Sequence, residues 1–246
     1  MNNCIAFFLT FLSGISTLLG LIPIFIKVKE EHKLLCSSLA FASGVMLSIS
    51  IIDLIPEAFR MFNNFSSFIS IIYVFIFLLF GIMISKLFDH TVSKYDNSSL
   101  YKVGIISMIG LIIHNIPEGI ITFFTASNNI KLGISMTIAI AMHNIPEGIS
   151  IGIPIYYSTN SKIKSFIYTF VAAISEIFGA FITYLFLSNY INNTIMGILF
   201  SVIAGIMIYI SLYELLLESI NYKKTIYTIL FFLIGFVFMI INLLLL

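Results

Sequence analysis

Charged side chains are scarce in this sequence. Asp, Glu, Lys and Arg make up 9% of its 246 residues, whereas an average soluble domain carries roughly a quarter. A soluble fold of this size could not cover its surface with so few charges. Together with a hydrophobic fraction of 60% and a mean hydropathy of +1.11, this scarcity predicts a polytopic integral membrane protein.

Other absences exclude classes of function. The two cysteines, Cys4 and Cys36, are too few and too isolated for a disulfide framework or a thiolate metal site. A net charge of +1 provides no basic face, so we expect no nucleic acid partner. The sequence has no glycine-rich lysine loop for nucleotide phosphates, so we expect no ATP hydrolysis by this chain, and we expect no prosthetic group.

Polar residues divide the chain into eight long apolar runs. A helix needs roughly 20 apolar residues to cross the hydrocarbon core, and each run reaches that length. A barrel strand would instead alternate over about ten residues, unlike the continuous apolar stretch at 69–84. We therefore predict an all-α polytopic membrane protein, with a single transmembrane domain over 1–246 and helices near 5–26, 34–58, 66–87, 102–124, 131–157, 165–187, 194–217 and 224–246.

The basic residues predict the orientation. Ten of the 12 Lys and Arg residues lie in or beside the segments that follow the first, third, fifth and seventh spans, and the other two are Arg60 and Lys131. Cytoplasmic loops carry an excess of Lys and Arg. We therefore expect these four segments in the cytoplasm and both termini outside.

One hexapeptide occurs twice at mid-span. His-Asn-Ile-Pro-Glu-Gly fills residues 114–119 of the fourth span and 143–148 of the fifth. Residues i and i+4 share a helix face, so the histidine and glutamate of each motif point the same way. Each histidine lies about 18 Å inside its span at 1.5 Å per residue, near the membrane midplane. Because adjacent spans are antiparallel, the motifs can face each other about a pseudo-two-fold axis in the membrane plane.

The motif prolines add a backbone feature. Pro117 and Pro146 cannot donate to the carbonyl of the preceding turn, so we expect a kink in each helix and a carbonyl free to meet water or an ion. Such freed groups are tolerated at membrane depth only beside protein or a water-filled cavity. For one motif alone, helix–helix contact by a buried His or Asn is the competing interpretation. The duplication favours a ligand site.

The buried charges predict a metal. An ionisable side chain near the bilayer centre costs at least about 2.5–3.5 kcal/mol, and Glu176 in the sixth span lies at similar depth. No Lys or Arg lies near the middle of any predicted span, since the lysines within the ranges stand at their ends: Lys86, Lys102, Lys131 and Lys224. Imidazole with carboxylate suits Zn(II), Fe(II), Mn(II), Co(II) or Cd(II), and we expect Zn(II) first and Fe(II) second. The candidate ligands exceed the four of one tetrahedral zinc, and two metals bridged by the motif glutamates would use them all: His114, Asn115, Glu118, His143, Asn144, Glu147 and Glu176.

Further positions bear on the route through the membrane. Asp53 lies near the outer end of the second span and Glu214 near the cytoplasmic end of the seventh. We expect Asp53 to attract cations at the entrance and Glu214 to help them leave, with snorkelling to the interface as the alternative. Met46 is interpreted as a packing residue. Small residues permit close helix contact, for example Gly44, Gly179 and Gly205.

These residues resemble the ZIP family of divalent metal transporters, and most closely its bacterial ZupT-like branch. The resemblance covers nearly the whole chain, including 44–47, 53–56, both hexapeptides with 122–133 between them, 175–179, 204–207 and Glu214. The family implies eight helices in a 3+2+3 arrangement with inverted repeats. Many members carry a His-rich loop between the third and fourth helices, whereas residues 88–101 here contain His90 as their one histidine.

Carried onto this chain, the resemblance implies a set of metal ligands. The primary metal would be held by His114, Glu118 and Glu147. Met46 or His143 would add to that shell. An adjoining second position would be formed by Asn115, Asn144 and Glu176.

The sequence thus predicts an importer of divalent transition metals in the bacterial cytoplasmic membrane, with zinc first and iron(II), manganese, cobalt and cadmium as further cargo. Its partners would be the metal ions and the lipid bilayer, and a homodimer is left open. The rival is an intramembrane metallohydrolase with a metal-activated water, but the His-Glu-x-x-His arrangement is absent. A metal-stapled structural protein fits less well, because structural zinc sites are closed four-ligand sets.

Overall fold

The structure is a computed structural model, and it describes residues 2–26, 29–92, 99–187 and 192–245. Within these ranges it is helical without strands, and eight helices are long and apolar enough to cross a membrane. They run over Asn3–Phe25, Glu31–Met61, Ser67–Val92, Ser99–Asn128, Ile130–Thr159, Lys162–Phe186, Asn193–Asn221 and Thr225–Leu244. The predicted all-α, eight-helix membrane fold is confirmed. Of the residues used for the orientation, Lys27 and Lys94 lie outside the described ranges, as do 93–98 of the loop between the third and fourth helices.

Several spans are built from more than one type of helix. Span 1 consists of α1 (Asn2–Ser16) and a 3₁₀ segment, η1 (Thr17–Phe25). Spans 2 and 7 each contain a π-type segment, so that span 2 is α2 (Glu31–Ile49), η2 (Ser50–Leu54) and α3 (Ile55–Met61), and span 7 is α8 (Asn193–Tyr209), η4 (Ile210–Leu216) and α9 (Leu217–Asn221). The other spans are α4 (Ser67–Val92), α5 (Ser99–Asn128), α6 (Ile130–Thr159), α7 (Lys162–Ile182) continued by the π-type η3 (Thr183–Leu187), and α10 (Thr225–Leu245).

Short polar caps fix the turns around the two hexapeptides. Asn129 is the one residue between α5 and α6, and its side chain accepts a hydrogen bond from the Leu132 amide at 3.2 Å. Asn160 ends α6 in the left-handed conformation with φ 53°, and Ser161 then caps α7. Asn and Ser are favoured helix caps because their side chains satisfy free backbone amides. These tight turns place α5, α6 and α7 side by side, each antiparallel to the next.

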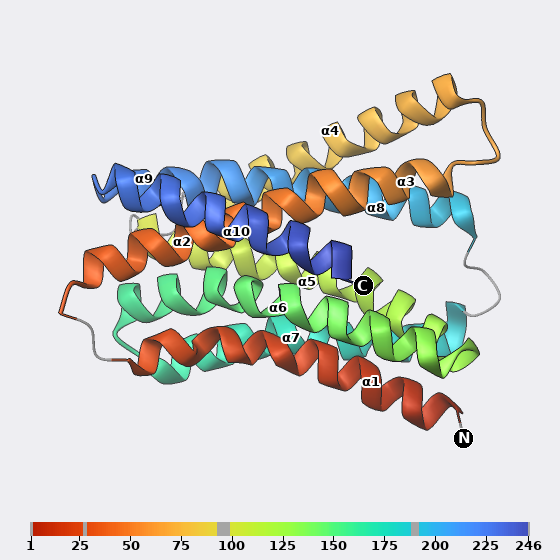
Figure 1. The fold of residues 1–246 in the computed structure, drawn as a ribbon, viewed down its shortest axis with the longest axis horizontal. Helices are drawn as coiled ribbons and strands as arrows, with labels where there is room; N and C mark the ends of the chain where they lie inside the picture. Colours follow the sequence, from red (N-terminus) through yellow and green to blue (C-terminus); the bar gives the residue numbers. More distant parts are fainter. Residues whose placement is uncertain (1, 27–28, 93–98, 188–191, 246) are drawn as a thin grey trace.

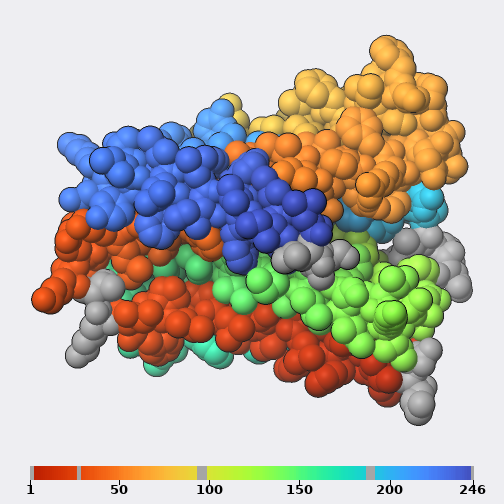
Figure 2. All heavy atoms as spheres, viewed as in Figure 1, coloured from red at the N-terminus to blue at the C-terminus, as the bar shows by residue number. Residues whose placement is uncertain are grey.

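The eight spans form two groups (Figures 1 and 2). Spans 1, 4, 5 and 6 make the lower half of the view in Figure 1, and spans 2, 3, 7 and 8 make the upper half. On the face drawn in Figure 2, spans 1 and 5 cover the lower part and spans 2, 3 and 8 the upper part. We call these the 1-4-5-6 group and the 2-3-7-8 group.

Glycines hold the 1-4-5-6 group together. Four of them lie so close to a neighbouring span that an added Cβ would lie 2.5 Å or less from a backbone carbonyl oxygen. The pairs are Gly20 with Ile145, Gly148 with Thr17, Gly119 with Glu176 and Gly179 with Ile116. Span 1 therefore packs reciprocally on span 5, and span 4 on span 6, at the closest approach two helices allow.

The 2-3-7-8 group uses the same device. Its pairs are Gly44 with Phe232, Gly235 with Phe41, Gly205 with Leu78 and Gly81 with Val202. Span 2 thus packs on span 8, and span 3 on span 7. The close contacts expected at Gly44, Gly179 and Gly205 are confirmed.

One spacing rule runs through both groups. In every one of these spans the contacted carbonyl lies three residues before the span's own glycine, as in Thr17 and Gly20 or Phe41 and Gly44. Each glycine Cα–H bond therefore points at a carbonyl of its partner, a weak hydrogen bond that recurs at helix crossings. The crossing of spans 1 and 5 is matched by that of spans 6 and 4, and the crossing of spans 2 and 8 by that of spans 7 and 3.

Candidate metal centre

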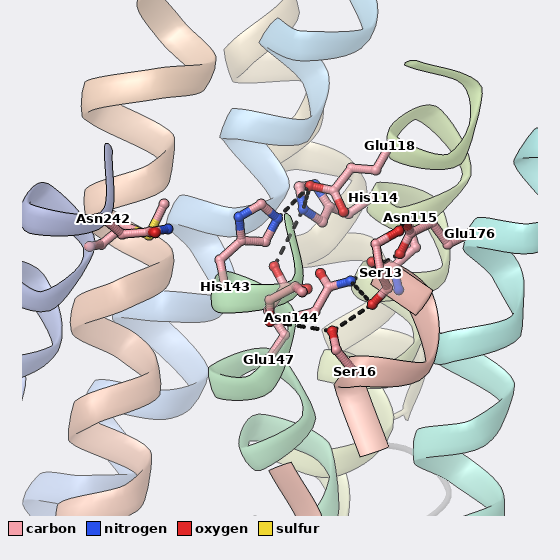
Figure 3. Close-up of polar contacts among 12 residues, drawn as sticks. Ser13, Ser16, His114, Asn115, Glu118, His143, Asn144, Glu147, Glu176 and Asn242 are labelled. Atoms are coloured by element: carbon pink, nitrogen blue, oxygen red, sulfur yellow. Dashed lines mark hydrogen bonds and ion pairs between the residues drawn. The ribbon is translucent and has the colours of Figure 1, made fainter. Parts of the chain in front are cut away.

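The two hexapeptides meet between α5 and α6 (Figure 3). His114 Nε2 lies 3.0 Å from Glu118 Oε1 and 3.3 Å from Glu147 Oε1. His143 Nε2 lies 2.8 Å from the same Glu118 oxygen. One carboxylate oxygen thus contacts both imidazoles, and the ligand atoms of His114, Glu118 and His143 all lie within 4.8 Å of one another. Three chemically suitable atoms therefore converge on a single point.

This four-residue cluster is buried and poorly satisfied by the protein. Glu147 is fully buried, His114 is 1% exposed and His143 5%. Both Nδ1 atoms and both Glu147 oxygens lack a hydrogen-bond partner among the described residues, as does Glu118 Oε2. Buried polar atoms without partners are costly, and a cation would satisfy several of them at once. Two imidazoles and two carboxylates are also the number and type of ligands that a tetrahedral zinc takes.

The asparagines of the motifs anchor the cluster to the neighbouring spans. Asn115 Nδ2 donates to the Ala172 carbonyl at 2.9 Å, and Asn144 Nδ2 donates to the Ser13 carbonyl at 3.0 Å. Because a carbonyl can only accept, these bonds fix which end of each amide is the NH₂ group. Both Oδ1 atoms remain buried without a partner among the described residues. They are therefore available as oxygen ligands.

Each hexapeptide thus contributes its His and Glu to the four-residue cluster, while its Asn and Gly anchor it to a neighbouring span. Its Asn donates to one carbonyl of span 6 or span 1, and its Gly lies against the carbonyl one turn further along that span. The helix continues unbroken through Pro117 and Pro146, so the expected kinks remain predictions.

Glu176 lies beside the cluster in a separate network. Its Oε2 accepts from Asn144 Nδ2 at 2.9 Å and its Oε1 accepts from the Ser13 hydroxyl. The side chain is fully buried, and its hydrogen-bond partners among the described residues are neutral. Of the seven predicted ligands, four form the cluster, Asn144 and Glu176 form this network, and Asn115 is bound to span 6. Met46 is fully buried within the apolar core.

A cavity of about 670 Å³ leads to the cluster. His114, Glu118 and His143 line its floor, and Asp53 and Glu57 line its wall. It extends to the end of the bundle where span 2 ends and span 7 begins, since Met61 and Asn193 also line it. Asp53 lies in the π-type segment η2, within electrostatic reach of His143 and Glu118.

The opposite end of the bundle carries a second charged cluster. Lys102 Nζ lies 2.5 Å from Asp89 Oδ1, and the Tyr209 hydroxyl donates to Asp89 Oδ2 at 2.8 Å. Glu214 lies in the π-type segment η4, is 4% exposed and is within electrostatic reach of Lys102 and Asp89. Ser99 donates to Glu218 at 3.0 Å. Through Lys102 and Ser99, span 4 is bound here to spans 3 and 7.

Sequence reasoning missed two of these features. Ser13 was not singled out, although the polar run Ser13-Gly14-Ile15-Ser16-Thr17 inside an apolar span is a visible signal. Lys102 is the first residue of the predicted fourth span and is used there only for orientation, whereas α5 begins at Ser99 and includes it. Its pairing with Asp89 joins residues of two different spans, which no local pattern reveals.

The fold and the site define a polytopic membrane protein with a buried cluster of potential metal ligands beside a cavity. Comparison with known proteins identifies the family. The family model described as ZIP zinc transporter matches residues 94–243. The chain is 36% identical to the zinc transporter ZupT of Clostridium perfringens, over 100% of this chain and 97% of that protein. It is 36% identical to the protein of that name from Streptococcus mutans, and 32% identical to that from Campylobacter jejuni, over 89% of both chains in each case.

The chain belongs to the ZIP family. It is accordingly a membrane transporter and not an enzyme. The metallohydrolase interpretation is therefore not favoured.

Proposed function

We propose that this protein imports divalent transition metals into the cytoplasm, with zinc as its main cargo, and that it does so without hydrolysing ATP. The carrying observation is the buried cluster of His114, Glu118, His143 and Glu147, of which His114, Glu118 and His143 line a cavity. A structural zinc site would be closed, whereas these ligands are reached from one end of the bundle. Family membership and relatives named zinc transporters support the same conclusion.

The ligand chemistry supports a range of cargo. Imidazole nitrogen with carboxylate oxygen is a mixed set that Fe(II), Mn(II), Co(II) and Cd(II) also accept. Mg(II) keeps several waters and prefers oxygen ligands in octahedral geometry. We therefore propose that Mg(II) is excluded because it would have to surrender water to two imidazoles.

The proposed route follows the acidic residues. In the predicted orientation the cavity opens outside, so the metal would pass Asp53 and Glu57, lose water to the four-residue cluster and leave toward Glu214. The Lys102–Asp89 and Ser99–Glu218 contacts close the cytoplasmic end in this conformation. The location in the bacterial cytoplasmic membrane, with both termini outside, belongs to the same proposal, and a homodimer stays a prediction.

We further propose that alternating access arises from movement of the 1-4-5-6 group against the 2-3-7-8 group. The matched glycine crossings support inverted repeats, with spans 1, 2 and 3 related to spans 6, 7 and 8, and span 4 to span 5. Backbone-to-backbone crossings join spans within each group. Across the two groups, an added Cβ at Gly110 would meet the movable side chain of Ile210. Each group can therefore move as a unit.

Uptake into sealed proteoliposomes tests the function. We expect saturable uptake of Zn(II), Fe(II) and Mn(II) but not Mg(II), and loss of uptake in the His114→Ala/Glu147→Ala double variant. Asn242→Leu is the matched control, because Asn242 is also a buried polar residue but lies apart from the cluster in Figure 3. Absence of flux from folded protein that still binds metal stoichiometrically would overturn transport and return attention to hydrolysis.

A further inference from the structure

Ser13 binds both residues of the network beside the metal cluster. Its hydroxyl donates to Glu176 Oε1, and its carbonyl accepts from Asn144 Nδ2 at 3.0 Å. Asn144 Nδ2 uses its second hydrogen on Glu176 Oε2 at 2.9 Å. Both oxygens of Glu176 therefore carry hydrogen bonds, whereas both oxygens of Glu147 carry none among the described residues. Glu176 is held while Glu147 is left available.

The matching position in span 6 separates the roles of the Ser13 backbone and hydroxyl. Ala172 offers its carbonyl to Asn115 as Ser13 does to Asn144. Each carbonyl also accepts from a serine three residues later, from Ser16 at 2.5 Å and from Ser175 at 2.6 Å. Alanine thus suffices for anchoring the motif. The hydroxyl of Ser13 is additional, and its long-range partner is the Glu176 carboxylate.

The Ser13 hydroxyl has a second acceptor, to which it can turn when Glu176 is released. Its Oγ lies 3.0 Å from the Thr10 carbonyl, and a hydroxyl has one hydrogen to give. When Glu176 moves away, that hydrogen can turn to Thr10, the ordinary back-bond of a helical serine. Asn144 keeps its bond to the Ser13 carbonyl in either arrangement. No buried donor of Ser13 is left unsatisfied by the change.

Gly14, which follows Ser13, lets span 1 approach Glu176 closely. An added Cβ at Gly14 would lie 3.2 Å from Glu176 Cβ and 3.3 Å from its Oε2. On the other side, Gly119 of span 4 packs against the Glu176 carbonyl. Glu176 therefore packs between Gly14 and Gly119, and Ser13 contacts the carboxylate end of its side chain.

We propose that Ser13 is a positioning residue that holds Glu176 away from the four-residue cluster and thereby sets whether the chain takes one metal or two. While Ser13 holds Glu176, the cluster binds one ion. A second ion binds at Glu176 and Asn144 Oδ1 when the Ser13 hydroxyl turns to Thr10. The proposal rests on the proposed transport function for the identity of the ligand, a divalent metal ion. It concerns how many metal ions are bound and not the rate at which they are transported.

Calorimetric titration of the detergent-solubilised full chain with Cd(II) and with Zn(II) tests the proposal. Ser13→Ala removes the hydroxyl and keeps the carbonyl. We expect the first ion to bind as in the wild type and the second to bind about 10- to 100-fold more tightly, the range set by one hydrogen bond to a charged group. Ser13→Cys, a weaker donor, should give an intermediate increase and serves if the alanine variant is unstable.

Two variants separate positioning from packing. Ser16→Ala removes a hydroxyl one turn away that donates to backbone carbonyls, so its second ion should bind as in the wild type. In the double variant Ser13→Ala/Glu176→Gln, the second ion should no longer bind more tightly than in the wild type. Equal second-ion affinity in Ser13→Ala and Ser16→Ala, or a tight second ion that survives Glu176→Gln, would overturn the proposal. A failure of uptake with these binding changes intact would refute the transport function alone.

Discussion

Gly148 is the glycine whose replacement most directly tests how the metal centre is held. It ends the second hexapeptide and lies against the carbonyl of Thr17 in span 1. In Gly148→Ala the new Cβ would overlap the Thr17 oxygen and lie 2.9 Å from the Thr17 carbonyl carbon and 3.3 Å from Gly20 Cα. All three atoms belong to backbone. No side chain can rotate away, so span 1 itself must move.

The expected cost follows from these contacts. Overpacking in a well-packed interior costs about 1–3 kcal/mol, and the upper part of that range applies because backbone must shift. Moving span 1 outward also stretches the 3.0 Å bond from Asn144 to the Ser13 carbonyl, which adds about 1 kcal/mol. We therefore expect Gly148→Ala to lower the free energy of unfolding by about 3–4 kcal/mol and to weaken metal binding.

Reversible unfolding in mixed micelles, with metal titration of the folded fraction, measures both effects. Gly110→Ala is the control, because its Cβ would overlap only the Cδ1 end of the Ile210 side chain, with Ile206 Cγ2 at 3.3 Å and Ile210 Cγ1 at 3.6 Å. A side chain can change rotamer, so that variant should lose about 1 kcal/mol or less. If Gly148→Ala is no less stable than Gly110→Ala, the backbone crossings do not hold the site and the reasoning fails.

Other predictions concern the ligands, the route and the orientation. Glu118→Gln should raise the Kd for Zn(II), measured by calorimetry, by roughly 100-fold or more, because one Glu118 oxygen contacts both histidines. The control Glu57→Gln, at the cavity wall, should leave the Kd nearly unchanged. An unchanged Kd in Glu118→Gln would remove Glu118 from the ligand set. Lys102→Met breaks a partly exposed ion pair with Asp89, worth about 1 kcal/mol after solvent screening, so the population of the cytoplasm-open state should rise about fivefold. The alkylation rate of a cysteine placed in the closed cytoplasmic half measures that population. Equal labelling with and without Lys102 argues against the closure. Uptake should fall as external pH drops from about 7.5 to 5, because protons compete with metal for histidine and carboxylate; a flat profile at fixed internal pH contradicts these ligands. Cys4 is exposed near the N-terminus, so an impermeant maleimide should label it from outside in whole cells, and protection there combined with labelling in inverted vesicles would reverse the predicted orientation.

The fold class and the convergence of the two hexapeptides could be predicted because both depend on local sequence. Apolar runs of sufficient length define spans, and the i, i+4 spacing of His114 and Glu118 is fixed within one helix. The meeting of the two motifs followed from antiparallel neighbours joined by a short turn, here Asn129. Most helices extend beyond the predicted span ends, by up to five residues at Val92, because hydropathy marks the hydrocarbon core and not where a helix ends.

The packing around the site could not be predicted in the same way. The partners of Gly148 and Asn144 lie in span 1, more than a hundred residues earlier in the chain, and spans 2 to 4 separate them in sequence. The Ser13–Glu176 bond likewise depends on which face span 1 presents. The hydroxyl residues of span 1 mark a face that packs inward but not which span it meets, and the glycine crossings decide that partner.

The acidic residues at the two ends of the proposed route occupy related positions in spans 2 and 7. If the crossings of spans 2 and 7 are superposed at Gly44 and Gly205, Asp53 falls at the position of Glu214 and Glu57 at that of Glu218. Both pairs begin in a π-type segment, a feature that recurs at functional sites in helices.

These related pairs differ in what closes them. Asp53 and Glu57 line an open cavity, whereas Glu218 is bound by Ser99 and Glu214 lies near the Lys102–Asp89 ion pair. In the proposed inverted repeats, the two halves adopt different conformations in one state, so related segments lie in opposite environments. The other state would arise if the halves exchanged these conformations. We infer that the cytoplasm-open state is reached when span 4 leaves spans 3 and 7, which exposes Glu214 as Asp53 is exposed now. An emerging divalent cation would then replace the ammonium of Lys102 among the same carboxylates, so metal arrival itself favours keeping that end open until the ion has left.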